Sequence, residues 1–228
     1  DKVDWREKQE YFQNTRKLIP EILQLFEQYE IECTWATVGM LFNENWEEWN
    51  QNIPDILPDY DNNKLSAYKY GKSIQSKETE ELCFAPELIK RIKEIPGQEI
   101  GTHTYSHYYC LEPGQTLKSF DADLQKSRVL AEKFGINLES LVFPRNQYNS
   151  NYLEVCKKIG LKTVRTNPEV WYWSNTQQDS LSQKIFRTGD AYIGLKNKSY
   201  NLISEISPGI TGQKASRLLR PYSRKDFL

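Results

Sequence analysis

The sequence predicts an α/β protein, in which helices alternate with the strands of a parallel sheet or barrel and lie on its outside. Between residues 86 and 166, helix-like and strand-like segments alternate three times, which is the pattern of repeated strand–helix–strand units. The chain has 228 residues, of which 38% are hydrophobic and 27% are charged, as expected of a globular protein with a polar exterior. We therefore expect a single domain over residues 1–228, long enough to bury a core without disulfides or metal.

The N-terminal part begins with a predicted helix over residues 11–30, where apolar residues recur at helical spacing and Pro20 marks an early turn or a mild kink. Residues 31–42 are rich in β-branched and aromatic side chains and predict an internal strand that runs into a loop. A short helical turn is expected at 46–50. Residues 53–80 mix Pro, Asp, Asn, Ser and Tyr without periodicity, and we expect a long surface insertion there.

The ends of the next three predicted helices are marked by residues that favour helix ends. Pro86 stands in the first turn of one helix, where its missing N–H costs nothing, and a glycine follows each of the three. The predicted helices cover 86–95, 116–134 and 150–159, and the strands that follow them cover 98–103, 140–144 and 161–166. Beyond Asn167 the signals weaken: 171–173 predicts a strand or wall segment, and 189–228 predicts turns with one helix.

Charge and composition exclude several classes of partner and location. Thirty Lys and Arg residues face 31 Asp and Glu residues, which leaves a formal charge of -1, so no basic surplus indicates binding to nucleic acid. No apolar run approaches the roughly 18 residues of an integral membrane segment. The charged segment that begins at Asp1 does not resemble a signal peptide, so we expect a cytoplasmic protein. The four cysteines are scattered, without a C-x-x-C pair, and predict isolated reduced thiols.

Polar clusters follow three of the predicted strands. They read THTYSH, RNQYN and RTNPE, and they start at residues 102, 145 and 165. Because active sites of parallel α/β folds lie at the carboxyl ends of the strands, we expect the three clusters to converge on one rim. The aromatic content of 13% fits a well-packed core, and it also fits a cleft whose flat rings cover the faces of sugars.

Both histidines of the chain lie in the first cluster, at positions His103 and His107. Two imidazoles four residues apart can point the same way and supply nitrogen ligands to Zn²⁺ or a similar divalent ion. A catalytic site of this kind adds a third ligand, often a carboxylate, and the ion lowers the pKa of its water to about 7. The structural alternative is that both histidines are hydrogen-bonded wall residues. No serine-hydrolase, P-loop or dinucleotide-binding signature is present.

Other polar residues near these strands have two interpretations each. Arg145 leaves a strand through Pro144, and its guanidinium could orient a carboxylate base or bind an anionic substrate. A structural ion pair at the strand end explains Arg145 equally well. Arg165 and Asn167 could serve similarly, although a structural role is favoured for both. Glu99 lies on an alternating strand pattern, which predicts a structural rather than a catalytic role.

Several segments of the sequence resemble one enzyme family. EIGTHTYSH resembles the metal-binding motif H-[ST]-x-x-H of the polysaccharide deacetylases, the carbohydrate esterases with NodB homology. CTWATVGMLF resembles the strand and loop before that motif, SLVFPRNQYN resembles the next motif in the variant form FPRNQYN, and GLKTVRTN resembles the strand after it. The order and spacing agree over residues 10–170. The resemblance implies a distorted (β/α) barrel and metal-dependent hydrolysis of N-acetyl or O-acetyl groups on sugars.

The resemblance also implies roles for individual residues. His103 and His107 would be ligands of a divalent metal, and Zn²⁺ is the ion that we expect. Four residues of the FPRNQYN motif would bind the substrate or present a backbone N–H to the oxyanion; they are Pro144, Arg145, Asn146 and Tyr148. Arg145 stands where the family has an aromatic residue.

Two further parts of the family pattern are not found in this sequence. The first motif of the family supplies an aspartate base and a carboxylate metal ligand from the first barrel strand. The resemblance places that strand before Asp1, so we expect the catalytic base upstream and a barrel without its first strand in this chain. The family pattern ends with a histidine that acts as general acid, and no third histidine is present here.

Three functions are compatible with these features. The leading hypothesis is a metal-dependent deacetylase that acts on an acetylated sugar or a surface-polysaccharide precursor. The first alternative is a carbohydrate-binding protein on the same fold that has no catalytic activity, which the missing third histidine favours. The second alternative is a deformylase-like enzyme that acts on a lipid-linked sugar.

Overall fold

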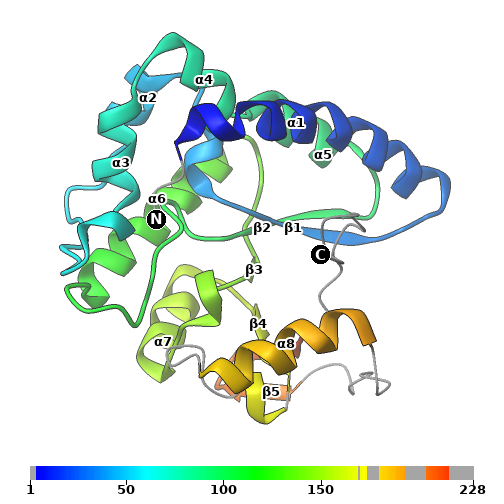
Figure 1. Cartoon of the computed structure of the whole chain (residues 1–228), viewed down its shortest axis with the longest axis vertical. Coiled ribbons are helices and arrows are strands. Elements are labelled where there is room, and N and C mark those ends of the chain that lie inside the picture. Colours follow the sequence, from blue (N-terminus) through cyan, green and yellow to red (C-terminus); the bar gives the residue numbers. More distant parts are fainter. Residues whose placement is uncertain (1–3, 169, 174–179, 194–203, 216–228) are drawn as a thin grey trace.

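Six strands form one sheet in the computed structural model, which describes residues 4–168, 170–173, 180–193 and 204–215. The strands are β1 (Cys33–Thr37), β2 (Gln98–Thr102), β3 (Ser140–Leu141), β4 (Thr163–Thr166), β5 (Ser204–Ser207) and β6 (Ile210–Lys214). Their order is β1-β2-β3-β4-β6-β5, and neighbours run parallel except in the β5–β6 hairpin (Figure 1). The predicted α/β class is confirmed. The sheet is open in the described residues, with β1 and β5 at its edges.

The register of the strands determines that the segments after β2 and β3 begin side by side at one edge of the sheet. Thr102, the last residue of β2, pairs with Thr37 of β1 on one side and with Leu141 of β3 on the other. His103 follows directly, and its N–H donates to the carbonyl of Thr37 at 2.8 Å. The segments that leave β2 and β3 therefore start at the same edge of the sheet, as the carboxyl ends of parallel strands require.

Helices of the described part surround the sheet (Figure 1). They are α1 (Trp5–Gln28), α2 (Trp46–Gln51), α3 (Ala67–Ile74), α4 (Lys77–Cys83), α5 (Pro86–Glu94), α6 (Leu117–Lys133), α7 (Ser150–Ile159) and α8 (Leu181–Ile193), with short 3₁₀ turns η1 (Gly39–Phe42), η2 (Asn63–Leu65), η3 (Pro144–Asn146) and η4 (Trp171–Trp173). Thr116 starts α6 through a capping box with Ser119, and Gly160 ends α7 with a left-handed φ of 99°. Among the described residues, no helix has the length and apolar character that crossing a bilayer needs.

Aromatic rings fill much of the core behind the ends of β2 and β3. Phe120 of α6 is fully buried, and its ring centroid lies 5.5 Å from that of Tyr108, 6.0 Å from that of Phe143 and 5.0 Å from that of Tyr152. These contacts fix the segments after β2 and β3 against α6 and α7. Part of the aromatic content therefore serves the core, which is one of the two roles that the composition allows.

The segment 53–80 is not the irregular stretch that its sequence predicts. It contains η2, α3 and α4, and it buries Tyr68 and Thr79. A serine caps each of the two helices, with Ser66 at the start of α3 and Ser76 in a capping box at the start of α4. The helices are short, and their buried side chains are polar-tipped rather than aliphatic. Each helix is shorter than the roughly 11 residues over which apolar periodicity identifies a helix in a sequence.

Three other boundaries differ from the prediction. Because Asp4 caps it, α1 begins at Trp5, before the predicted start at residue 11. Residues 171–173 form the 3₁₀ turn η4 and not a strand. The helix α8 begins at Leu181, so only its last residues fall in the region 189–228 where turns and one helix are expected, and the described part of that region adds the β5–β6 hairpin. The hairpin strands are short and polar, and the parallel pairing of β6 with β4 is a long-range contact that local sequence does not indicate. The rest of 189–228 lies outside the described residues.

Candidate functional site

The two histidines meet directly after β2. The centroids of the His103 and His107 rings lie 4.7 Å apart, with an angle of 69° between the ring planes. His103 Nδ1 lies 2.6 Å from the carbonyl oxygen of Val142, in the segment after β3. A carbonyl only accepts hydrogen bonds, so Nδ1 carries the proton and Nε2 keeps its lone pair. This is the arrangement in which a backbone carbonyl orients a metal-binding imidazole.

Burial keeps both imidazoles in the neutral form at neutral pH. It lowers the pKa of His103 to about 4, and the neighbouring His107 ring adds to this effect. Burial also lowers the pKa of His107, with a smaller contribution from the positive charge of Arg145. Neutral imidazole is the form that binds a metal ion, so binding at this site would not need to displace protons near pH 7.

The loop between the histidines has an uncommon backbone conformation. Thr104 and His107 have φ values of 64° and 57°, in the left-handed region that costs energy for residues other than glycine. Two threonine hydroxyls stabilise the turn. Thr102 Oγ1 accepts from the N–H of Thr104 at 3.0 Å, and Thr104 Oγ1 accepts from the N–H of Tyr108 at 2.7 Å. These bonds bend the chain back on itself so that the two rings meet.

The FPRNQYN segment forms the neighbouring rim. Arg145 and Asn146 also have positive φ values, of 54° and 51°. The Arg145 guanidinium lies 4.5 Å from the centroid of the Tyr109 ring, and that centroid lies 5.1 Å from the centroid of His107. Arg145 Nη1 donates to Glu112 Oε1 at 3.1 Å. The structure thus brings Arg145 close to the histidine pair, and it also shows the ion pair of the structural interpretation.

The other predicted residues of this segment hold the shape of the rim. Pro144 is buried at the start of η3. The N–H of Asn146 donates to the carbonyl of Phe143 at 2.8 Å, and Asn146 Oδ1 accepts from Arg165 at 3.2 Å. Tyr148 stacks on Phe143 with 4.9 Å between ring centroids. The N–H of Asn146 is therefore already bonded within the turn.

Three further polar residues, on β2, on β4 and directly after β4, differ in the hydrogen bonds that they make. Arg165 bonds to the rim through Asn146. Asn167 Oδ1 is buried without a hydrogen-bond partner among the described residues. Glu99 on β2 accepts a hydrogen bond from Thr34 on β1 at 2.5 Å, so it joins two adjacent strands.

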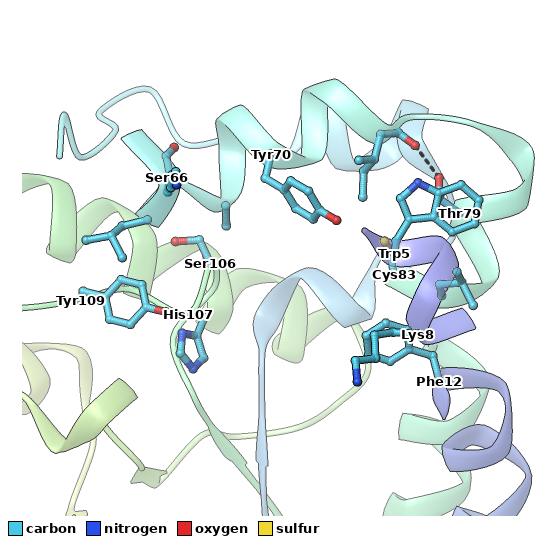
Figure 2. A pocket seen from close by; sticks show the side chains of 15 residues that line it. Trp5, Lys8, Phe12, Ser66, Tyr70, Thr79, Cys83, Ser106, His107 and Tyr109 are labelled. Carbon is cyan, nitrogen blue, oxygen red and sulfur yellow. Dashed lines mark hydrogen bonds between the residues drawn. The ribbon is translucent and has the colours of Figure 1, made fainter. Parts of the chain in front are cut away.

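A cavity of about 430 Å³ opens beside His107. It is lined by α1, η2, α3, α4 and the histidine loop. In Figure 2, His107 and Tyr109 lie at one end and Trp5 and Phe12 at the other, with Tyr70 of α3 between them. The four aromatic rings give the cavity apolar walls, which suit the faces of a pyranose ring. We call this cavity the aromatic groove.

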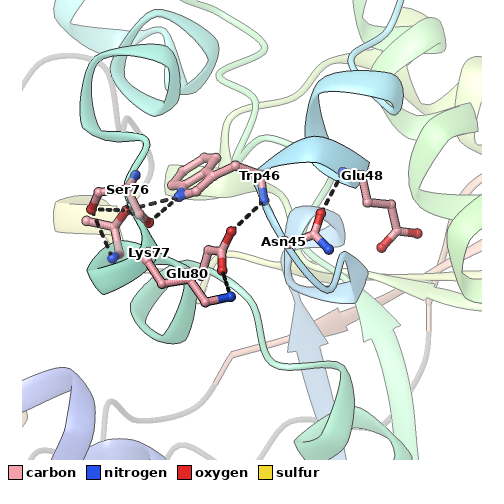
Figure 3. Close-up of polar contacts among 7 residues, drawn as sticks. Asn45, Trp46, Glu48, Ser76, Lys77 and Glu80 are labelled. Carbon is pink, nitrogen blue, oxygen red and sulfur yellow. Dashed lines mark hydrogen bonds and ion pairs between the residues drawn. The ribbon is translucent and has the colours of Figure 1, made fainter.

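Hydrogen bonds fix the wall of the groove that α3 and α4 form. Trp46 Nε1 of α2 donates to the carbonyl of Ser76 at 3.1 Å and lies 3.0 Å from Thr79 Oγ1 (Figure 3). On the opposite side, the Tyr60 hydroxyl accepts from the N–H of Tyr109 at 2.9 Å. The segment 53–80 is therefore attached both to α2 and to the histidine loop. Sequence reasoning missed this wall because its two helices are too short to give a recognisable periodic pattern.

The histidine pair offers two nitrogen donors to a divalent metal ion. Both imidazoles are neutral, and Nε2 of His103 is free of the bond that Nδ1 makes. The pair fits two positions of a catalytic zinc site, which takes three protein ligands. Within the described ranges, no group of three His, Cys, Asp or Glu side chains could hold a metal ion. The described residues thus supply two ligands and not a complete site.

The fold is similar to several solved structures at 13–15% sequence identity. A de-N-acetylase from Aggregatibacter actinomycetemcomitans is 13% identical with a TM-score of 0.44, over 74% of this chain and 70% of that chain. IcaB from Ammonifex degensii is 13% identical with a TM-score of 0.43, over 65% of this chain and 54% of that chain. A CE4 family pseudoenzyme from Bacillus anthracis is 15% identical with a TM-score of 0.41, and the match covers 65% of this chain but 38% of that one. No curated protein matches the sequence.

One family matches the sequence over most of its length. The sequence model for polysaccharide deacetylases matches residues 11–164. That range runs from α1 into β4 and includes the histidine pair, the groove wall and the FPRNQYN rim. The match covers more than half of the chain, and it agrees with the motifs in their order along the sequence. The chain belongs to the polysaccharide deacetylase family.

Proposed function

We propose that the protein is a metal-dependent deacetylase that removes N-linked or O-linked acetyl groups from a sugar or a surface-polysaccharide precursor. One observation carries the proposal. In a chain of the polysaccharide deacetylase family, two neutral imidazoles meet at the end of a groove with aromatic walls. The groove would hold sugar rings through their apolar faces, and the histidine pair would mark the place of the reaction.

The proposal assigns roles to the predicted site residues. His103 and His107 would bind a divalent ion, with Zn²⁺ the ion that suits two imidazoles. When bound, such an ion polarises the acetyl carbonyl and activates water. The proposal assigns no catalytic base to a residue of this chain.

The rim residues would act on the substrate in this proposal. Arg145 would orient a carboxylate base or bind an anionic group, since its guanidinium already lies beside the Tyr109 ring next to the histidines. Pro144, Asn146 and Tyr148 would shape the backbone that faces the oxyanion. The N–H of Asn146 is bonded within the turn, so a different N–H of this rim would be the donor.

A carbohydrate-binding protein without catalytic activity is the second candidate. The absence of a third histidine from the sequence favours it, because the family pattern uses such a residue as general acid. The aromatic groove would serve this function unchanged. The two candidates differ in one measurable product, which is free acetate.

The test uses the full-length protein with its metal content measured by mass spectrometry and acetate release measured on N-acetylated and O-acetylated oligosaccharides. The variants are His103→Ala and His107→Ala, with Tyr29→Ala as control, since this exposed ring lies at the C-terminal end of α1. We expect the wild type and the control to hold a divalent ion and release acetate, and both histidine variants to lose the ion and the activity. Glycan binding without acetate release would support the second candidate. A wild type that neither holds metal nor releases acetate would contradict the proposal.

A further inference from the structure

Asp123 is a buried acid that the proposed reaction does not use. It lies in α6 and has no exposed surface. Burial raises the pKa of its carboxyl group, while the hydrogen bonds that it accepts act in the opposite direction. A buried carboxyl group is costly unless polar groups surround it, so the donors that converge on Asp123 indicate what it does.

Most of these donors come from the loop between the two histidines. Asp123 Oδ1 accepts from the N–H of Tyr105 at 2.7 Å and from the N–H of Ser106 at 3.4 Å. Asp123 Oδ2 accepts from the Ser106 hydroxyl. Two successive N–H groups can point at one oxygen only when the backbone is turned as it is in anion-binding nests. The carboxyl group therefore holds the turn between His103 and His107.

The fourth donor comes from a different element. The Tyr68 hydroxyl of α3 donates to Asp123 Oδ2 at 2.7 Å, and the Tyr68 ring stacks on Tyr105 at 6.3 Å between centroids. Asp123 thus connects α6, the groove wall and the histidine loop. Of the two hydroxyl groups that donate to Asp123, that of Ser106 belongs to the histidine loop and that of Tyr68 does not. Removing each in turn therefore separates an effect on the histidine loop from an effect on the stability of the fold.

We infer that Asp123 is a positioning residue, which sets the relative orientation of the His103 and His107 rings by fixing the backbone between them. This rests on the proposed function, in which the two histidines bind a divalent ion. The left-handed conformations of Thr104 and His107 are costly for these residues. The loop therefore needs contacts from outside it to keep this conformation. Asp123 supplies them by accepting hydrogen bonds from Tyr105 and Ser106, which lie between Thr104 and His107.

The test measures the affinity of the full-length protein for Co²⁺, by calorimetry and by the visible absorption of the bound ion, well below the unfolding temperature of every variant. Asp123→Asn removes the carboxylate, and Asp121→Asn is the matched control on the same helix, where the side chain pairs with Lys158 at 3.5 Å. We expect Asp123→Asn to weaken Co²⁺ binding about tenfold or more, as loss of groups that orient metal ligands does. The control should bind as the wild type does.

A second pair of variants serves if Asp123→Asn does not fold. Ser106→Ala and Tyr68→Phe each remove one hydroxyl that donates to the same oxygen. If Asp123 orients the histidine rings, Ser106→Ala should weaken Co²⁺ binding and change the absorption spectrum of the bound ion. Tyr68→Phe should lower the unfolding temperature without changing the affinity for Co²⁺. A purely structural role predicts lower stability and unchanged affinity in both, and that result would overturn the inference. If the wild type itself binds no Co²⁺, the proposed function fails and the inference fails with it.

Discussion

Burial controls the protonation of the side chains around the aromatic groove. It lowers the pKa of His103 to about 4 and raises the pKa of the Cys83 thiol to about 11, because in each case the charged form loses its hydration. All four cysteines are unpaired, as the sequence predicts. Neutral imidazoles can still bind a metal, whereas a thiol with so high a pKa is a poor nucleophile at neutral pH.

We expect alkylation of Cys83 by iodoacetamide to accelerate about tenfold for each pH unit between roughly pH 7 and pH 10, because the reactive thiolate increases until the pKa is reached. Peptide mapping by mass spectrometry separates Cys83 from the other three thiols. The urea-unfolded chain is the control, since a thiol with the ordinary pKa of about 8.5 reacts at a constant rate above about pH 9.5. A similar plateau in the folded protein would contradict the raised pKa.

Within an element, packing can override the preference of the backbone. Gly71 lies in α3, where alanine would be favoured over glycine by about 1 kcal/mol on helix propensity alone. A β-carbon at this position would meet the Trp49 ring at 2.8 Å from Cη2 and 3.0 Å from Cζ2. Trp49 is 1% exposed, so it cannot move without disturbing the core. The glycine allows α3 to approach α2 closely.

We expect Gly71→Ala to lower the free energy of unfolding by about 1–3 kcal/mol, the usual cost of overpacking. Gly189→Ala in α8 is the matched control, because no heavy atom of the described residues lies within 4 Å of its β-carbon. That control should raise the free energy of unfolding by about 0.4–1 kcal/mol. Urea denaturation measures both variants. A more stable Gly71→Ala protein would show that α3 does not pack on Trp49 as described.

At the scale of the whole molecule, the candidate site is assembled from segments that are distant in sequence. The histidine loop follows β2, the rim follows β3, the groove wall comes from α3 and α4, and Asp123 lies on α6. The unfolded chain holds no such arrangement, so an ion that binds this site stabilises the folded state by mass action.

We expect Zn²⁺ at 100 times its dissociation constant to raise the free energy of unfolding of the full-length protein by about 2.7 kcal/mol. Thermal unfolding with and without the ion measures the change, and a chelator should reverse it. His103→Ala, which removes one of the two proposed imidazole ligands, should lose the stabilisation. An equal effect of Zn²⁺ on that variant would mean that the ion binds elsewhere.

Elements with strong local signals agree between sequence and structure. Pro86 starts α5 and Gly160 ends α7 as predicted, because these helix ends depend on residues within one turn. The histidine pair was also predicted from sequence, since four-residue spacing is a local feature. The segment 53–80 was not, because its two helices are short although serines cap them, and the β5–β6 hairpin was not, because β6 pairs with the distant β4.

The sequence by itself determined the α/β class, the approximate extent of α5, α6 and α7 and the place of both histidines along the chain. Only the tertiary structure decided that Asp123 and Tyr68 stand behind the histidine loop, at 18 and 37 positions from Tyr105, and that Arg145 reaches Tyr109 beside His107. The reason is physical. Periodicity and capping act over a few residues, whereas the partner of a buried polar group is chosen by the folded chain as a whole.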